Sequence, residues 1–400
     1  MRNYSYLCRS ILSVSQYYNL DMKRLLFCAF ALLFGSCAGL YVSERVALAV
    51  PERQNWSGVK INGDIERIEA QSFELLGYSG YEYKGELLNQ TTTEFNLRGD
   101  VVSVVSVDDQ MPDSESYSYT YDSEGRLVGK VISFGSSSDE HRYTLDEYGC
   151  ITVDEIYTDG GELDSRITIS YDDAGNDVEH VATNRVGRTT FVQQRHYDQN
   201  NQCVEELYSD GDSEVRSRVT TTYDAEGRKL SVVTYEGRNL LKSSVEYAYV
   251  DGEVLCTTYD ESGAFVSKVG ERVDAEGRVV EATSYDAQGA IISRDATVYD
   301  AEGRIVEQNT MNGAEEVVVN KVYEYDENGC LVKLTENDSQ IPALTVFVYT
   351  YDDQLNLVKE RCYMGKYLAC QYVIEYNITY REAAKANADE TLEVQPEEQI

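Results

Sequence analysis

Cysteine is the residue whose placement in this chain most directly suggests chemistry. Cys37 follows the small residues Gly35 and Ser36, after an apolar run from Leu25 to Phe34 and a basic start at Met22. A basic start, a short apolar segment and small residues before the processing point form the layout of a secretory signal peptide. With a cysteine at the end, the layout resembles a bacterial lipobox, so we expect Cys37 to be the site of lipidation.

The apolar run is too short for a transmembrane helix, which needs about 20 apolar residues. We therefore expect residues 1–37 to be a signal peptide, with either Met1 or Met22 as the initiator, and residues 38–58 to be a tether. This predicts an exported protein of the cell envelope or cell surface that is lipid-anchored to a membrane. An ordinary cleaved signal with a chance cysteine is the alternative.

The remaining cysteines show no C-x-x-C spacing, which disfavours a zinc site. Cys8 and Cys28 lie within the expected signal, and Cys362 and Cys370 flank a short turn at Gly365. A disulfide between Cys362 and Cys370 would suit an exported protein, if the cross-strand geometry allows it. We expect the others to pack as small apolar residues: Cys150, Cys203, Cys256 and Cys330.

Catalytic motifs are absent from the sequence. It contains three histidines, His141, His180 and His196, and no nucleophile elbow, phosphate loop, dinucleotide fingerprint or His-Glu-x-x-His helix. The 70 Asp and Glu residues make some glycosidase-like carboxylate pair inevitable, so no particular pair is informative. We therefore expect no catalytic residues, no metal and no cofactor.

A Tyr-Asp-x-x-Gly sequence recurs along the chain, mostly in steps of 26 residues. Fixed-period self-similarity is the signature of a repeat architecture. Between Tyr259 and Tyr299 the steps are 14, 12 and 14, which divides each unit into two halves. Clear copies start at Tyr121, Tyr171, Tyr223, Tyr259, Tyr285, Tyr299 and Tyr325, and weaker ones at Phe95, Leu145, Tyr197, Val273 and Tyr351.

Each copy has the chemistry of a tight turn. Asp suits the first turn position, where its carboxylate accepts the backbone N–H two residues further on. The glycine falls where a turn-plus-bulge hairpin needs a positive φ. A calcium-binding interpretation is weak because each turn offers only two or three carboxylates. The structural turn glycines are Gly125, Gly227, Gly277, Gly303 and Gly329.

The segments between the turns alternate tyrosine with polar residues, as in Tyr117, Tyr119 and Tyr121, which predicts half-buried antiparallel strands. The tyrosines form either a structural ladder, which we favour, or a sugar-stacking platform. One 26-residue unit then holds two strands. An open sheet rarely exceeds about ten strands, so we expect an all-β antiparallel β-meander over residues 59–380 that is coiled or rolled into a spiral or partial shell. Residues 381–400 are predicted to be an acidic disordered tail.

The repeated Tyr-Asp-x-x-Gly-Arg-Leu/Val/Ile motif, as at Tyr121–Leu127 and Tyr299–Ile305, resembles the YD-repeat (RHS-repeat) family. The resemblance covers about residues 95–355 and implies β-sheet that spirals into a shell, sometimes around a C-terminal toxin. Only about twenty residues follow the last repeat here. The chain therefore looks like the short bacterial surface form without a toxin domain.

The net charge of −35 opposes nucleic-acid binding, which needs a basic surface, and electrostatic docking on an anionic bilayer. We expect a non-catalytic cell-surface lipoprotein whose repeat scaffold serves in binding or adhesion. Its extracellular ligand would be a carbohydrate, the cell wall or a protein, and its membrane contact would be the N-terminal lipid. The alternatives are an exported glycan-active enzyme and a shell-like or antitoxin-like partner of another protein.

Overall fold

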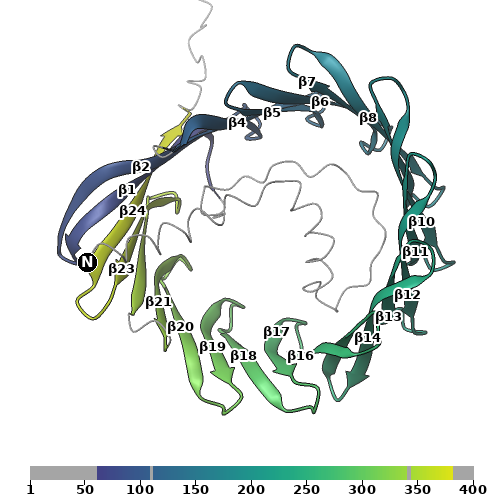
Figure 1. The fold of residues 1–400 in the computed structure, drawn as a ribbon. Coiled ribbons are helices and arrows are strands. Elements are labelled where there is room, and N and C mark those ends of the chain that lie inside the picture. The colour runs from purple at the N-terminus through teal and green to yellow at the C-terminus, as the bar shows by residue number, and fades with distance from the viewer. Residues whose placement is uncertain (1–60, 109–110, 340–343, 382–400) are drawn as a thin grey trace, which may run out of the picture.

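The computed structural model describes residues 61–108, 111–339 and 344–381, and these residues form one antiparallel sheet of 24 strands (Figure 1). This confirms the all-β meander. The strands are β1 Ile65–Tyr78, β2 Tyr81–Phe95, β3 Val101–Asp108, β4 Met111–Tyr121, β5 Leu127–Phe134, β6 Ser137–Leu145, β7 Ile151–Thr158, β8 Glu162–Tyr171, β9 Asp177–Asn184, β10 Thr189–Tyr197, β11 Cys203–Asp210, β12 Val215–Tyr223, β13 Lys229–Glu236, β14 Leu240–Val250, β15 Glu253–Asp260, β16 Phe265–Val273, β17 Val279–Tyr285, β18 Ile291–Tyr299, β19 Ile305–Asn312, β20 Val317–Tyr325, β21 Leu331–Asp338, β22 Thr345–Tyr351, β23 Leu357–Met364 and β24 Ala369–Tyr380.

The sheet closes into a barrel, which corrects the expected spiral or partial shell. β1 pairs with β24 from Ile65 opposite Tyr380 to Glu74 opposite Tyr372. Closure removes both sheet edges, whose unpaired N–H and C=O groups would otherwise be open to other chains. An antiparallel meander can close in this way only with an even number of strands, because the first and last strands must run in opposite directions.

The turns fall on two rims. Turns from even-numbered to odd-numbered strands form the anchor rim, and turns from odd-numbered to even-numbered strands form the far rim. Most Tyr-Asp turns lie on the anchor rim, but those that start at Tyr259 and Tyr285 lead from β15 to β16 and from β17 to β18. The 12- and 14-residue steps therefore mark Tyr-Asp turns at opposite ends of the barrel.

The position of the β1–β2 hairpin shows which face of the sheet points outward and which faces the lumen. Its tip lies outside β23 and β24 in Figure 1, and Glu82 in the tip accepts a hydrogen bond of 2.7 Å from the hydroxyl of Tyr363. Tyr363 is therefore on the outer face. Side chains alternate along a strand, so Cys362 and its partner across the ladder, Phe347, face the lumen. Tyr349, two residues after Phe347, shares that face.

The two clusters of buried hydrophobic side chains both lie where the barrel closes. We call β1, β2, β23 and β24 the seam, and β3–β22 the wall. One cluster, with Ile65, Leu357 and Tyr376, lies on the lumen side. The other, with Leu75, Val346 and Val373, lies on the outer side beneath the hairpin tip. The seam thus holds most of the core, while wall side chains are mainly half-buried.

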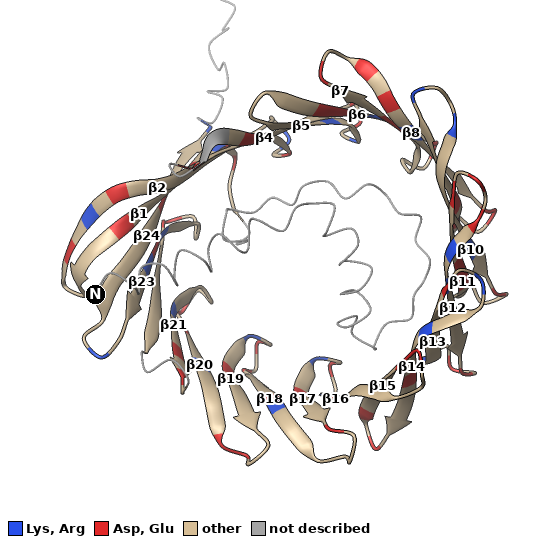
Figure 2. Ribbon diagram, viewed as in Figure 1, with Lys and Arg blue, Asp and Glu red and all other residues tan. Residues whose placement is uncertain are grey.

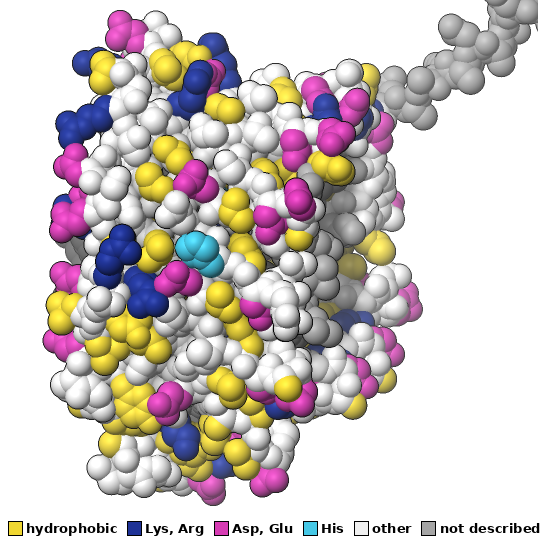
Figure 3. All heavy atoms as spheres, turned by 90° about the vertical axis from the view of Figure 1, so that its right-hand side faces the viewer, with side chains coloured by type: hydrophobic (Ala, Val, Ile, Leu, Met, Phe, Trp, Pro, Cys, Tyr) yellow, Lys and Arg dark blue, Asp and Glu magenta, His cyan; other side chains and the backbone are white. Residues whose placement is uncertain are grey.

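The outer surface of the wall is mixed in character. Figure 2 shows acidic and basic residues distributed around the ring, and the outer face in Figure 3 carries hydrophobic and charged side chains interspersed. Ion pairs cross neighbouring strands there, such as Arg218 with Glu205, whose other oxygen lies 3.2 Å from His196. Within the described residues, no helix has the length and apolar character to cross a membrane.

Candidate binding surface

The tyrosines before the anchor-rim turns are held by a repeated hydrogen bond. Tyr325 on β20 donates its hydroxyl to the carbonyl oxygen of Ile305 on β19, at 2.8 Å. The acceptor always lies 20 residues earlier in the chain. The same bond is made by Tyr121, Tyr171, Tyr197, Tyr223, Tyr249, Tyr299 and Tyr351. These hydroxyls are committed to the scaffold, and the tyrosine ladder is structural.

Arginines join successive anchor-rim turns. Arg304 donates its Nε–H to Asp300 at 2.7 Å, and its guanidinium lies 4.7 Å from the ring centre of Tyr325 in the next repeat. This contact has cation–π geometry. Arg278 and Tyr299 repeat it at 4.6 Å. The side chains of the rim therefore serve to hold one repeat against the next.

The tyrosines at the far rim of the seam differ from these. Tyr78, Tyr81 and Tyr83 on the β1–β2 hairpin are 54%, 74% and 64% exposed, and Tyr367 in the turn between β23 and β24 is 82% exposed. The rings of Tyr78 and Tyr81 lie 5.4 Å apart, tilted by 54°. The backbone N–H of Ser79 bonds the carbonyl of Leu368, which brings the two turns together. We call Tyr78, Tyr81, Tyr83 and Tyr367 the tyrosine patch.

The hairpin presents this patch because its two faces differ. Leu75 is buried, Glu82 bonds Tyr363, and Lys84 forms an ion pair of 2.7 Å with Glu375, so this face holds the hairpin against the barrel. Tyr81 and Tyr83 alternate with Glu82 and Lys84 and therefore point away from the barrel. Three of the four patch residues are thus carried by an anchored strand pair, and no hydrogen bond is described for the patch hydroxyls.

A cluster of charged and polar side chains on β9–β11 surrounds Arg195. Its guanidinium bonds Asp177 and, at 3.2 Å, Glu206. Burial alone would raise the pKa of Asp177, but the hydrogen bond with His180 and the charge of Arg195 hold it below its ordinary value. Burial also raises the pKa of the nearby Cys203 thiol to about 11, so this thiol is a poor nucleophile. Both carboxylates are paired with Arg195, which favours a structural role.

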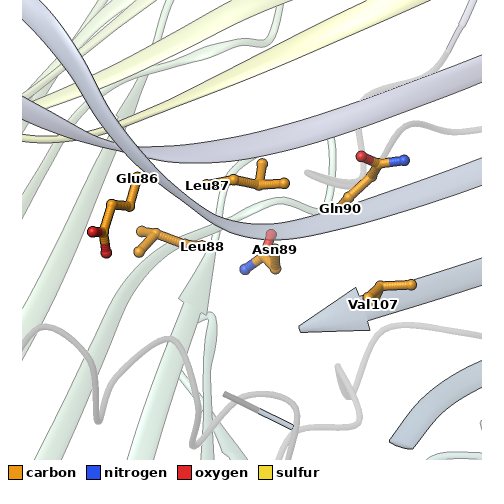
Figure 4. A pocket seen from close by; sticks show the side chains of 6 residues that line it. All are labelled: Glu86, Leu87, Leu88, Asn89, Gln90 and Val107. Atoms are coloured by element: carbon orange, nitrogen blue, oxygen red, sulfur yellow. The ribbon is translucent and has the colours of Figure 1, made fainter. Parts of the chain in front are cut away.

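A shallow depression of about 560 Å³ follows the patch along the same strand. Figure 4 shows the side chains that line it, which come from β2 and the end of β3: Glu86, Leu87, Leu88, Asn89, Gln90 and Val107. Tyr83 and Glu86 are three residues apart on one strand, or roughly 10 Å. The depression therefore begins close to the patch along β2.

The turn glycines lie where the sequence predicts them. The φ angles of Gly125, Gly227, Gly277, Gly303 and Gly329 are 88°, 82°, 81°, 83° and 81°. The turn carboxylate accepts as expected: Asp122 takes the N–H of Glu124 at 2.9 Å. A register shift at the tyrosine, as between Val298 and Tyr299, supplies the bulge.

The expected disulfide is wrong. Cys362 and Cys370 are not joined by a disulfide, because a register shift places Cys362 opposite Tyr372 and Cys370 opposite Tyr363. The two thiols therefore lie on opposite faces of the hairpin. Cys37, the signal, the tether and the tail lie outside the described residues. Among those described, no group of His, Cys, Asp or Glu is arranged to hold a metal ion.

The tyrosine patch was not predicted from the sequence. The repeats begin with the weak copy at Phe95, so the earlier segment has no Tyr-Asp anchor. The signal that could have found it is Tyr81-Glu82-Tyr83-Lys84, in which aromatic and charged residues alternate next to a Ser-Gly turn. Such a strand has one aromatic face and one charged face.

Comparisons with known proteins add little about function. A family model described only as "Uncharacterised protein" matches residues 219–328. No curated protein matches the sequence. Among solved structures, a porin-like protein from Bacteroides uniformis is 11% identical, with 79% of this chain and 96% of that one covered and a TM-score of 0.24.

Two further structures are similar at lower scores. A chain of the TcdB2-TccC3-Cdc42 structure is 12% identical, with 76% of this chain and only 25% of that chain covered and a TM-score of 0.16. A DUF1329 family protein from Desulfovibrio piger is 8% identical, with 79% of this chain and 86% of that chain covered and a TM-score of 0.11. At these scores none of the three informs the function of this chain.

Proposed function

We propose that this chain is a non-catalytic, exported surface lipoprotein of the YD-repeat type whose barrel is a scaffold for binding or adhesion. The observation that supports this is the tyrosine patch. Tyrosine offers a large, rigid and amphipathic contact area at low entropic cost, which suits a binding surface. Here the rings stand exposed on an anchored hairpin of a closed barrel, while the ladder tyrosines are engaged in the scaffold.

The lipid anchor rests on Cys37 and the segment before it. Cys37→Ala should leave the protein without lipid and move it from the membrane fraction to a soluble or unprocessed form. Metabolic labelling with a fatty acid, followed by fractionation, measures both effects. Unchanged labelling of the variant would refute the anchor and would leave the binding role open.

The binding role is tested with the full chain carrying Cys37→Ala, so that lipid does not contribute. Purified protein is titrated onto washed bacterial envelopes, and the bound fraction is measured. We expect saturable binding by the folded protein that is lost after heat unfolding. Binding that never saturates, or that is equal for folded and unfolded chains, would overturn the role.

A further inference from the structure

We propose that the tyrosine patch is a saccharide-binding site that takes a neutral oligosaccharide chain along the outer face of the β1–β2 hairpin. This inference rests on the proposed binding function and assigns it a site and a ligand class. It does not involve the tyrosine ladder, whose hydroxyls bond the backbone.

The geometry of the rings suits sugars. A pyranose has an apolar face of C–H groups and hydroxyls around its edge. The C–H face stacks on an aromatic ring, while the hydroxyls form hydrogen bonds. Tyr78 and Tyr81, 5.4 Å apart and tilted by 54°, form an angled cradle about as long as one sugar unit. Tyr83 continues the row along the strand, because residues two apart share one face.

Polar groups surround the rings. The patch hydroxyls have no described partner, and the side chains of Ser79, Glu86 and Lys366 are exposed beside them. An aromatic surface with a few convergent polar groups is the usual composition of a small-molecule site. The depression lined by Glu86 and Leu87 begins a few residues beyond Tyr83 on the same strand.

The size of the patch favours a saccharide over a folded protein partner. The four rings offer roughly 500 Å² of exposed surface, taking about 200 Å² for a whole tyrosine. A stable protein interface needs about 800 Å² on each side. Nucleic acid, whose bases could also stack, is opposed by the net charge of −35.

The test uses three neutral probes, cellohexaose, chitohexaose and maltohexaose, titrated calorimetrically into the full chain carrying Cys37→Ala. The test variant adds Tyr81→Ser and Tyr83→Ser. The matched control adds Tyr148→Ser, because Tyr148 is 63% exposed and lies in an anchor-rim turn, at the opposite end of the barrel from the patch. Thermal unfolding checks that all three proteins are equally folded.

We expect at least one probe to bind, and the double variant to bind it roughly tenfold more weakly or worse, as for the loss of an aromatic stacking contact. The control should bind like the parent. Failure of all three probes, or equal binding by parent and double variant, would overturn the saccharide site. If envelope binding then persists and is abolished by protease treatment of the envelopes, the partner is a protein and the scaffold function survives.

Discussion

Tyrosine has different roles in the wall and in the seam of this barrel. In the wall, a tyrosine such as Tyr325 is half-buried and bonded to the backbone of the strand before it. In the seam, Tyr376 is buried in a core, whereas Tyr81 is exposed. Each repeat of the wall thus contributes a similar set of hydrogen bonds and contacts. In the seam, a few buried residues form most of the hydrophobic core. Among the described residues, the exposed aromatic side chains gather at the seam, whereas those of the wall, Phe134, Tyr148 and Phe191, are scattered.

The largest difference should appear when strands are deleted from the wall. Deleting Tyr299–Glu324 removes two strands, leaves an even number and replaces one anchor-rim turn with the next. Deleting Tyr299–Met311 removes most of β19 and leaves an odd number. β24 would then run parallel to β1, and the pairing from Ile65 to Glu74 could not form.

We expect the 26-residue deletion to remain β-rich by circular dichroism and to melt cooperatively close to the parent, as nearest-neighbour stability implies. The 13-residue deletion should aggregate or melt much earlier. If both deletions behave alike, neither modularity of the wall nor closure at the seam governs stability.

The next effect contrasts two tyrosines of the seam. Tyr376→Ala removes a buried ring from the lumen-side cluster and should cost about 3–5 kcal/mol in the free energy of unfolding. Tyr81→Ala, at an exposed position, should change it by less than about 0.5 kcal/mol. Guanidinium titration of both variants measures the two values. Equal losses would show that the patch is part of the core and not a spare surface.

Local features of this fold were predictable, and long-range ones were not. The φ of Gly303 and the alternation of Tyr117 and Tyr119 are set by a few neighbouring residues. The closure joins Ile65 to Tyr380, the two ends of the described sheet, and nothing in the repeat specifies how many copies complete a ring. The disulfide prediction failed because the bulge near Cys370 changes the register by one residue, which exchanges the two faces.

The same limit explains why the candidate site was missed. Tyr78 and Tyr81 come before the first repeat, and their exposure depends on the hairpin lying over β23, almost 300 residues later, through the bond of Glu82 to Tyr363. No local pattern reports such a contact. What the sequence does contain is the alternation that gives the hairpin two different faces, once its place on the barrel is known.

High pH should weaken the wall through its tyrosines. Burial, as the main cause, raises the pKa of Tyr121, Tyr223 and Tyr351 to about 12, against an ordinary value of 10.0. Between these values the folded state holds protons that the unfolded state has lost, so stability is full below pH 10 and falls as the pH rises toward 12.

Denaturation midpoints across this interval measure that fall. Tyr223→Phe, which cannot ionise there, should make the dependence on pH less steep. An unchanged slope would show that Tyr223 does not contribute to it.

A turn glycine of the wall should matter less than a core residue of the seam. Gly303→Val forces a β-branched residue to a φ of 83° and brings its Cβ to about 3.0 Å from the guanidinium of Arg278, at an expected cost of roughly 1–2 kcal/mol. Ala301→Ser, in the same turn, should be nearly neutral. Equal melting temperatures for the two variants would refute the turn's dependence on glycine.

The smallest expected effect on stability comes from removing one tyrosine hydroxyl. Tyr325→Phe keeps the ring beneath Arg304 and removes only the hydrogen bond to Ile305, so the expected loss is about 1 kcal/mol. Tyr83→Phe removes a hydroxyl that has no described partner and should change stability by less than about 0.5 kcal/mol. Chemical denaturation resolves this difference. If Tyr83→Phe proves as costly as Tyr325→Phe, the seam hydroxyls are also used by the scaffold, and the distinction between ladder and patch disappears. If Tyr83→Phe is neutral for stability yet weakens oligosaccharide binding, that hydroxyl serves the ligand and not the fold.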